Sequence, residues 1–472
     1  MGSPFRMSRS IYFYLALLPH QFPSHNLVII FFACVGLSMA DTPANCLYED
    51  IRGTWKLHET ERNGNHSISC DELGEIVHEN TFTLEFPDVV KDELGNQGTW
   101  TMIYNQGFEV NINQRSYFAF SYYEGDWGSS TSYCNRTFNG WSRDVTIRNW
   151  SCFKAEKLAQ VPPTFTERPV LTNGGQMYKN DENLIKKINI AQTSWTAKAY
   201  PEHENYTVEE MYLRTGGLAS VMTKLLSAAP VSPELQATVA SLPDSFDWRN
   251  INGVNYISPV GDQASCGSCY AFASVANLEA KLRIASKNQR QDIFSTQDMV
   301  SCTYLDQGCS GGFDYLVAGR YAMEQGVVSE SENRYLGRDA PCTTSQAATR
   351  TYVKDYRHVG GYYGACNEAA MIEAIVNRGP VSVSFQVYSD FPSYSDGIYH
   401  HTGFVNEFNP FEETNHVVLV VGYGVEESTG EKYWIVKNSW GDWWGEKGYF
   451  RIRRGTDECA IESMAVEIDI IP

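Results

Sequence analysis

The segment Gln263-Ala-Ser-Cys-Gly-Ser-Cys-Tyr270 contains the cysteine with the strongest case for chemistry, Cys269. An amphipathic helix is predicted from Cys269 to Ile284, because apolar residues recur there at intervals of three and four. Cys269 would then lie in the first helical turn, where free backbone N–H groups and the helix dipole favour a thiolate. The small residues Gly267 and Ser268 would let a substrate backbone approach the sulfur.

A thiolate nucleophile needs an imidazole that holds it as an ion pair and later protonates the leaving amine. The candidate base is His416, at the start of the apolar stretch Val417–Tyr423. The side-chain carbonyl of Asn438 could accept a hydrogen bond from the imidazole and fix its tautomer. The amide of Gln263 could donate to the developing oxyanion beside the backbone N–H of Cys269.

Each of these residues also has an ordinary structural interpretation. Cys269 could be half of a disulfide, and His416 could be a hydrogen-bonded histidine beside a sheet. Asn438 could simply form a turn, and Gln263 could be a surface amide. The four residues nevertheless occur in order and in matching local sequences, which favours a hydrolase with a nucleophilic cysteine.

Length and composition limit the class of protein. A chain of 472 residues is too long for one ordinary core, and an apolar fraction of 43% excludes a mostly disordered chain. A net charge of −19 argues against nucleic acid or an anionic membrane surface as a partner. The pair His400-His401 lacks a ligand spacing typical of zinc, so no metal site is predicted.

The N-terminal 40 residues are predicted to be a signal peptide. Arg6 and Arg9 precede an apolar run from Leu27 to Ala40, which ends in small residues before Asp41. An uncleaved membrane anchor is the alternative, but a span needs about 20 apolar residues and this run is shorter. No membrane partner is therefore expected.

Cysteines and glycosylation signals agree with passage through an oxidising compartment. Twelve cysteines in a secreted chain imply disulfides. The acceptor asparagines of four glycosylation triplets are Asn65, Asn135, Asn149 and Asn205.

Residues 41–158 are predicted to form strands. The segments 81–86, 99–104 and 117–123 are rich in β-branched and aromatic residues and are separated by Gly and Asn clusters. This pattern is typical of an antiparallel all-β barrel or sandwich. Cys46, Cys70, Cys134 and Cys152 suffice for two internal bridges, and spacing alone leaves their pairing open.

The rest of the chain divides into two parts. Residues 159–241 have no cysteine and contain helix-forming patches such as 181–188. They are predicted to be a pro-segment or linker that is removed on maturation, with a helical interdomain spacer as the alternative. The end of this part, 232–243, is predicted to be an exposed linker. Residues 242–472 are predicted to be a mixed helix-and-strand unit with buried strands at 417–423 and 433–437.

At these positions, residues 242–472 resemble the papain family of cysteine proteases. With its N-terminal part included, the chain resembles the cathepsin C (dipeptidyl peptidase I) group of that family over nearly its whole length after the leader. The segments that carry this resemblance are 41–46, 311–315, 360–367, 397–404 and 451–462. The implied fold is α+β: a papain-like catalytic fold with a helical and a β-barrel-like subdomain, preceded by an antiparallel β-barrel exclusion domain.

The resemblance implies a dipeptidyl aminopeptidase that acts on peptides and proteins with free N-termini. In this group the exclusion domain blocks one end of the cleft, and its N-terminal carboxylate holds the substrate's α-ammonium; here that residue would be Asp41. The first alternative is a papain-like endopeptidase with an unblocked cleft. A binding or scaffold protein with a spent active site would leave the intact catalytic set unexplained, as would a β-barrel lipid carrier.

The resemblance also implies further site residues. Gly311 and Gly312 would line the cleft, and Ile461 would lie near the wall of the second specificity pocket. Tyr315 matches one of two tyrosines that line a chloride site, whereas His358 stands where the second is expected. The implied disulfides are Cys46–Cys134, Cys70–Cys152, Cys266–Cys309 and Cys302–Cys342. Cys366 and Cys459 would be buried thiols.

Partners and location follow from the same resemblance. It implies a homotetramer, an activating protease, and residence in a lysosome or a related acidic vesicle, or secretion. Chloride is the only cofactor that it implies.

Overall fold

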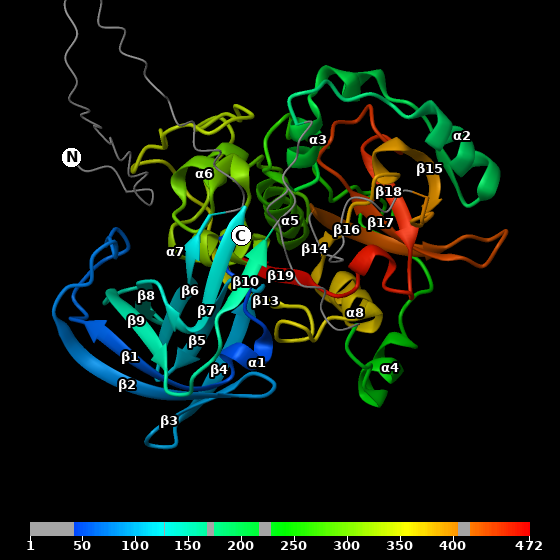
Figure 1. The fold of residues 1–472 in the computed structure, drawn as a ribbon. Helices are drawn as coiled ribbons and strands as arrows, with labels where there is room; N and C mark the ends of the chain where they lie inside the picture. The colour runs from blue at the N-terminus through cyan, green and yellow to red at the C-terminus, as the bar shows by residue number, and fades with distance from the viewer. Residues whose placement is uncertain (1–41, 127, 168–173, 217–227, 405–415) are drawn as a thin grey trace, which may run out of the picture.

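The computed structural model of this chain describes residues 42–126, 128–167, 174–216, 228–404 and 416–472. The predicted signal peptide 1–40 and Asp41 lie outside the described residues. Figure 1 shows a blue and cyan antiparallel barrel beside a green-to-red unit in which helices pack against a second sheet. The α+β class and the two kinds of domain predicted from the sequence are confirmed.

The first domain is a closed antiparallel barrel. Eight strands follow one another in the order β1-β2-β3-β4-β5-β6-β8-β9, and β9 pairs back with β1. The strands of this domain are β1 (Gly53–Thr60), β2 (Ile76–Glu85), β3 (Val89–Asp92), β4 (Gln97–Ile103), β5 (Gly107–Ile112), β6 (Arg115–Gly125), β7 (Ser129–Thr137), β8 (Gly140–Asp144), β9 (Ser151–Lys157) and β10 (Thr164–Glu167). Of the two predicted architectures, the barrel is the one that forms.

Alternation of side chains along the strands explains the barrel interior. In β1, every second residue from Trp55 is buried, as expected where one face of a strand points to a core. Phe82, Trp100 and Phe108 fill the same core. Two disulfides, Cys46–Cys134 and Cys70–Cys152, cross-link the domain.

The second domain contains a nine-stranded sheet. Eight strands run in the order β11-β15-β18-β17-β16-β14-β19-β13, and β12 pairs with β16. These strands are β11 (Trp195–Ala197), β12 (Phe246–Asp247), β13 (Val353–His358), β14 (Val381–Phe385), β15 (Tyr394–Tyr399), β16 (His416–Val425), β17 (Lys432–Lys437), β18 (Tyr449–Arg453) and β19 (Ala465–Ile470). The predicted buried strands at 417–423 and 433–437 are therefore confirmed as parts of β16 and β17.

Helices cover this sheet and the barrel junction. They are α1 (Tyr48–Ile51), α2 (Glu182–Ala191), α3 (Val208–Arg214), α4 (Pro233–Val239), α5 (Cys269–Ala285), α6 (Thr296–Cys302), α7 (Ala322–Glu324) and α8 (Glu368–Arg378). Short helical turns are η1 (Pro201–Asn205), η2 (Gly308–Ser310), η3 (Tyr315–Tyr321), η4 (Phe391–Ser393) and η5 (Glu458–Ala460).

The long helix α5 forms where the sequence predicts it, but it is not amphipathic. From Cys269 to Arg283 all but one of its residues are buried, and this includes the charged ones. Lys281 donates its ammonium to the carbonyl of Arg378 at 2.7 Å, and Glu279 accepts the backbone N–H of Phe294 at 2.9 Å. A helix that is covered on nearly every side is a core element. Its charged residues suggest an exposed face in the sequence, although they are buried in the structure.

Residues 159–241 pack along the second domain. Asp181 caps α2 by accepting two backbone N–H groups, and β11 adds to the sheet through β15. Figure 1 shows α2 and α3 along the outer edge of this domain, near β15 and β18. The predicted linker 232–243 is exposed, but part of it is helical: Ser232 caps α4, which lies against α8. The Ser-Pro pair at its start is a helix-start signal.

The two domains meet at a buried network of charges. Arg320 of η3 contacts Glu109 of the barrel strand β5 at 3.1 Å and Glu324 of α7 at 3.1 Å. Arg143 of β8 also pairs with Glu324, and Tyr356 donates to Glu109 at 2.8 Å. All five side chains are buried, so these pairs join the domains away from solvent.

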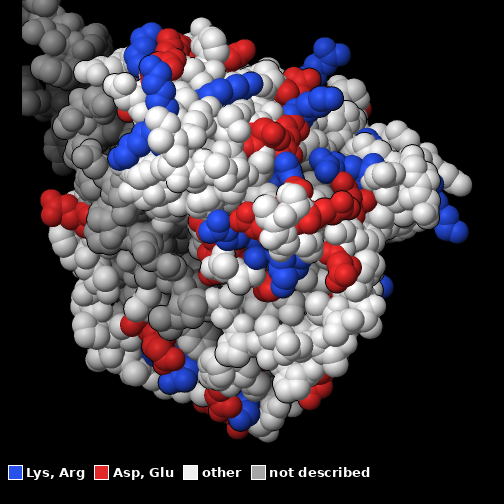
Figure 2. Space-filling model, turned by 90° about the vertical axis from the view of Figure 1, so that its right-hand side faces the viewer, with Lys and Arg blue, Asp and Glu red and all other residues white. Residues whose placement is uncertain are grey.

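The surface is mixed in charge. On the face shown in Figure 2, acidic and basic side chains are interspersed rather than separated into one basic surface. Within the described ranges, no helix is long and apolar enough to cross a membrane, and no group of three or more His, Cys, Asp or Glu side chains could hold a metal ion.

Candidate active site

Cys269 is the first residue of α5, as the sequence predicts. Just before it, Cys266 forms a disulfide with Cys309, which fastens the loop to the segment around η2. Cys302–Cys342 forms the fourth disulfide, whereas Cys269 remains a thiol. All four disulfides join the pairs that the resemblance implied. The thiol therefore lies in a cross-linked loop at the positive end of a helix dipole.

A chain of hydrogen bonds joins the other three predicted catalytic residues. Nε2 of His416 lies 2.8 Å from Oδ1 of Asn438, and this oxygen also accepts the backbone N–H of Ser439 at 2.8 Å. The hydroxyl of Ser439 in turn donates to Oε1 of Gln263 at 2.7 Å. Three segments that are far apart in the sequence thus share one continuous network.

Gln263 is held by both ends of its side-chain amide. Its Nε2 donates to the carbonyl of Cys266 at 2.9 Å, while its Oε1 accepts from Ser439. An amide nitrogen carries two hydrogens, so one N–H is left after the bond to Cys266. Complete burial of Gln263 and these two bonds fix the direction of that N–H.

The environment of His416 favours the neutral imidazole. Burial is the main cause that lowers the pKa of His416 to about 4; the Asn438 bond opposes it, and the positive charge of Arg214 adds to it. The ring of Trp440 packs against the imidazole, with 5.4 Å between the ring centres and 37° between their planes. Nδ1 of His416 is buried and has no hydrogen-bond partner among the described residues. This nitrogen is therefore the one left to exchange a proton with a thiol.

The end of α3 lies against the same network. Arg214 is fully buried and donates to the carbonyl of Ala264 at 2.8 Å and to Oδ1 of Asp262 at 3.1 Å. The indole of Trp440 donates to the backbone carbonyl of Arg214 at 2.9 Å. A side chain from residues 159–241 thus contacts the residues on either side of Gln263.

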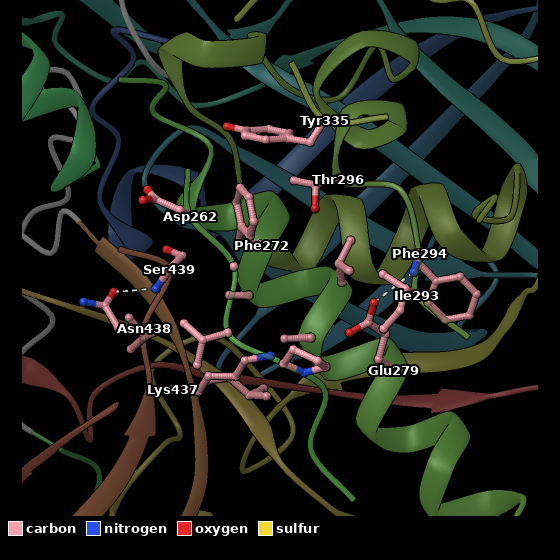
Figure 3. Close-up of a pocket in the computed structure, with 18 of the residues that line it drawn as sticks. Asp262, Phe272, Glu279, Ile293, Phe294, Thr296, Tyr335, Lys437, Asn438 and Ser439 are labelled. Atoms are coloured by element: carbon pink, nitrogen blue, oxygen red, sulfur yellow. Dashed lines mark hydrogen bonds between the residues drawn. The ribbon is translucent and has the colours of Figure 1, made fainter. Parts of the chain in front are cut away.

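A cavity of about 340 Å³ lies between α5 and strands β16 and β17. In Figure 3, Asp262, Asn438 and Ser439 border it on one side, and Glu279 and Lys437 lie further along. Burial lowers the pKa of Lys437 to about 8 and raises the pKa of Glu279. Of the four predicted catalytic residues, Asn438 lines this cavity, whereas Cys269, His416 and Gln263 do not, so the cavity lies beside Cys269 and His416 rather than around them.

The predicted cleft residues occupy different settings. Gly311 has a positive φ of 128°, and a side chain at Gly312 would collide with the ring of Tyr270. Both glycines come shortly after Cys309, whose disulfide to Cys266 holds this segment close to the loop before Cys269. Ile461 is fully buried in the core of the second domain, two residues after Cys459. Burial raises the pKa of Cys366 and of Cys459 well above the usual value, which suits packing residues.

The two predicted chloride-site residues lie together. The rings of Tyr315 and His358 stack at 4.4 Å with 15° between their planes. Nε2 of His358 lies 3.3 Å from the carbonyl of Met102 in the barrel strand β4, and burial lowers the pKa of His358 to about 4.

The predicted glycosylation sites lie on the surface. Asn65, Asn149 and Asn205 are exposed, and Asn135 is half-buried. Asn205 belongs to η1 and the other three to the barrel.

Asp41 lies outside the described residues, but its neighbour Thr42 is well placed. The backbone N–H and the hydroxyl of Thr42 both donate to Oε1 of Gln106, at 2.7 and 2.8 Å. Gln106 belongs to the turn between β4 and β5, and Tyr104 of that turn stacks on Phe313 at 4.2 Å. The start of the barrel domain is thus tied to a turn that contacts the segment after Gly311 and Gly312.

Sequence reasoning missed several residues of this site. Ser439 joins Asn438 to Gln263, and its place directly after Asn438 was the available signal. Arg214 and Tyr104 act across long sequence separations, and no local pattern pointed to them. Asp314, which is buried beside Tyr104, carried a signal only as an acidic residue in an apolar segment.

Comparisons with known proteins agree with this architecture. A model of the papain family of cysteine proteases matches residues 242–468, and a model of the cathepsin C exclusion domain matches residues 41–157. A cathepsin C from Schistosoma mansoni is 41% identical over 454 residues, which cover 94% of this chain and 98% of that protein. Pro-cathepsin H from Mus musculus is 36% identical over 230 residues, or 47% of this chain and 64% of that protein. A digestive procathepsin L2 proteinase from the larval midgut of Tenebrio molitor superposes with a TM-score of 0.50 at 31% identity, covering 61% of this chain and 88% of that structure.

Proposed function

The chain belongs to the cathepsin C branch of the papain family of cysteine proteases, and on that premise we propose that it is a dipeptidyl aminopeptidase with Cys269 as nucleophile. Cysteine peptidase activity follows from the family. The exopeptidase specificity and the roles of individual residues are the proposal.

The proposed reaction begins with a proton transfer from Cys269 to Nδ1 of His416. The thiolate attacks the carbonyl carbon of the second peptide bond, and the carbonyl oxygen takes up the electron pair as an oxyanion. The remaining side-chain N–H of Gln263 and the backbone N–H of Cys269 stabilise that oxyanion. When the tetrahedral intermediate collapses, the C–N bond breaks and His416 protonates the leaving amine.

Water completes the cycle. His416 removes a proton from a water molecule, which attacks the carbonyl carbon of the thioester. The C–S bond breaks, the dipeptide leaves as a carboxylic acid that loses its proton to solvent, and the thiolate–imidazolium pair is regenerated. Throughout, Asn438 holds the imidazole by its Nε2–H, so that Nδ1 faces the reaction.

One observation supports the exopeptidase specificity above the others. Thr42 is fastened to Gln106 in a turn that packs on Phe313, two residues after the predicted cleft residue Gly311. The residue before Thr42 is Asp41, which signal-peptide cleavage would make the N-terminus. A carboxylate at that place would bind a substrate's α-ammonium at a fixed distance from the sulfur, and this distance sets the product length.

Residues 159–241 are proposed to be a pro-segment that an activating protease removes. Arg214 contacts both flanks of Gln263, and Gly267 faces the carbonyl of Leu213. A segment in this position adds burial and positive charge beside His416, and both oppose the imidazolium that catalysis needs. A homotetramer, glycosylation at the four asparagines, and an acidic vesicle or secretion remain predictions from the resemblance.

Product analysis tests this proposal. The matured protein is incubated with a ten-residue peptide that has a free N-terminus, and the products are followed by mass spectrometry. The proposal expects successive losses of two residues, with no cleavage by the Cys269→Ala variant. The endopeptidase alternative predicts internal fragments instead, in proportions that do not depend on the N-terminus.

A further inference from the structure

Asp314 is a buried carboxyl group that accepts from three hydrogen-bond donors and has no cationic partner among the described residues. Its Oδ1 accepts the hydroxyl of Tyr104 at 2.5 Å and the backbone N–H of Tyr315 at 3.0 Å. Its Oδ2 accepts the hydroxyl of Ser382 at 2.5 Å. Asp314 is 1% exposed, and it forms no salt bridge within the part of the chain that the structure describes. A buried carboxylate without a counter-ion needs a specific reason.

The donors come from three different elements. Tyr104 follows the barrel strand β4, Tyr315 begins η3, and Ser382 lies in β14. Ser384, also in β14, supports this set through a contact of 3.2 Å between its hydroxyl and that of Tyr104. Convergence of donors from the barrel, η3 and β14 is the arrangement of an anion-binding site, and here a carboxyl group of the chain itself occupies it. Burial raises the pKa of Asp314, whereas the bonds from Ser382, Tyr104 and the backbone of Tyr315 oppose that rise and favour the charged form.

This carboxylate lies where the resemblance predicts chloride. Asp314 directly precedes Tyr315, and Tyr315 stacks on His358; these are the two predicted chloride-site residues. Tyr363 packs against both His358 and Tyr104, at 5.6 and 6.0 Å between ring centres. The predicted chloride position and the carboxylate thus belong to one buried aromatic cluster.

The residues present do not fit a chloride ion. The backbone N–H of Tyr315 is already donated to Asp314. His358 places Nε2 near the carbonyl of Met102, so Nε2 carries the proton and Nδ1 presents a lone pair, which has no partner among the described side chains. With the pKa of His358 lowered to about 4, the ring is neutral at neutral pH. A chloride here would meet a carboxylate and a lone pair instead of donors.

We propose that the carboxylate of Asp314 takes the place of chloride in this protein, and that peptidase activity therefore does not need a halide. This inference rests on the proposed function only because part of its test measures peptidase activity. Asp314 is a positioning residue, because it acts through Tyr104.

The role of the anion depends on the turn to which Tyr104 belongs. Tyr104 has a left-handed backbone (φ 53°), an unusual conformation for a bulky residue, and the bond to Asp314 and the stack on Phe313 hold it there. The same turn presents Gln106 to Thr42. Loss of the carboxylate would loosen this turn and, with it, the start of the barrel domain. The effect should fall on KM for substrates with a free N-terminus more than on kcat.

The test compares the matured wild type with Asp314→Ala and Asp314→Asn at pH 7, in a HEPES buffer free of halide and of small carboxylates, with increasing sodium chloride or bromide. Hydrolysis of a dipeptide reporter with a free N-terminus gives kcat and KM, and thermal unfolding gives Tm without reference to activity. The alanine variant leaves a space that a halide can fill, whereas the asparagine variant fills the space without charge.

The wild type should change by less than about twofold in kcat/KM across the halide series, and its Tm should not depend on which salt is used. Asp314→Ala should show KM raised about tenfold without halide, with KM and Tm recovering as chloride or bromide is added. Asp314→Asn should show the same rise in KM, and neither its KM nor its Tm should recover when halide is added.

A several-fold activation of the wild type by chloride would overturn the proposal, as would an alanine variant that no halide restores in either KM or Tm. If the alanine variant does not fold, the halide series on the wild type decides alone. If the wild type does not cleave the reporter, the proposed function fails, and the Tm comparison still tests the anion site.

Discussion

Oδ1 of Asn438 accepts two hydrogen bonds, one from Nε2 of His416 and one from the backbone N–H of Ser439, each at 2.8 Å. Because a carbonyl oxygen can only accept, Nε2 carries the proton and Nδ1 of His416 bears the lone pair. The amide of Asn438 is itself fixed by the Ser439 bond. The tautomer that the proposed proton transfer from Cys269 requires is thus set by Asn438, a neighbour to which the proposal gives no part in bond making.

Asn438→Ala should lower kcat about tenfold. The variant lacks the hydrogen bond that orients the imidazole, and this loss should raise the activation free energy by about 1.4 kcal/mol. The substrate-binding residues are untouched, so KM should change little. Alkylation of Cys269 should still go to one equivalent, which would show that the thiol survives. The matched control is Asn63→Ala, at an exposed barrel residue. A loss of the same size in that control would contradict the assigned role.

Removal of residues 159–241 should raise the pKa of His416. Burial, and to a lesser degree the positive charge of Arg214, lower this pKa to about 4 in the uncut chain, since both disfavour the imidazolium. Loss of the segment removes the charge and part of the burial. NMR titration of the His416 ring in uncut Cys269→Ala protein, before and after proteolytic removal of the segment, measures the change. An identical pKa in the two forms would contradict the proposal that residues 159–241 oppose the His416 imidazolium.

The packing of residues 159–241 should weaken in acid because of His203. This histidine of η1 is buried among aromatic rings, including those of Tyr200 and Trp443, and burial together with Arg214 lowers its pKa to about 3. The folded form therefore keeps the ring neutral, while the unfolded form binds a proton below pH 6.5. The stabilisation is complete above that pH and falls as pH decreases towards 3, by about 2 kcal/mol at pH 5.

The variant His203→Phe keeps the aromatic packing without a titrating group. Limited proteolysis at pH 5 and pH 7 should show cleavage within 159–241 that is faster at pH 5 in the wild type. The pH dependence should be weaker in His203→Phe and unchanged in His66→Phe, at an exposed barrel residue. Equal acid sensitivity in wild type and His203→Phe would assign the effect to other groups.

Arg320→Met should loosen the barrel from the catalytic domain. The change leaves the carboxylates of Glu109 and Glu324 without the guanidinium that both contact at 3.1 Å. Breaking such a buried pair costs about 3–5 kcal/mol. Thermal unfolding should show a lower Tm. Cleavage of an N-acetylated reporter should also rise, because the proposed function has the barrel block the cleft.

Arg290→Met provides the matched control for that change. Arg290 forms an ion pair with Asp292 at 2.9 Å, but both side chains are more than 40% exposed. An exposed pair contributes less than about 1 kcal/mol. If the two variants lose stability equally, the buried network does not hold the domains together.

Local patterns were enough to predict most of the fold. Runs rich in β-branched and aromatic residues, such as 117–123, predicted the barrel strands, and the apolar run after His416 predicted β16. The segment 263–270 was enough to predict Cys269 as the nucleophile, because the residues of this motif follow one another in the sequence. The charged residues of α5 were misleading: Glu279, Lys281 and Arg283 suggest a solvent face, yet each is buried. Only tertiary packing decides that.

The long-range parts of the site could not be predicted from the sequence. Arg214 reaches Asp262, and Tyr104 reaches Asp314, across separations for which no sequence period exists. The chloride prediction rested on Tyr315 and His358 alone. It left out Asp314, whose significance appears only when the donors from the barrel and from β14 converge on it.

The central claim is that the N-terminal barrel measures two residues from a free N-terminus. It is tested most directly by the rates at which the matured protein hydrolyses a dipeptide-amide reporter and its N-acetylated twin, with Cys269→Ala as control. The account predicts cleavage of the free form alone, and only when Cys269 is present. Equal cleavage of both forms would show an open cleft and an endopeptidase, despite the barrel domain.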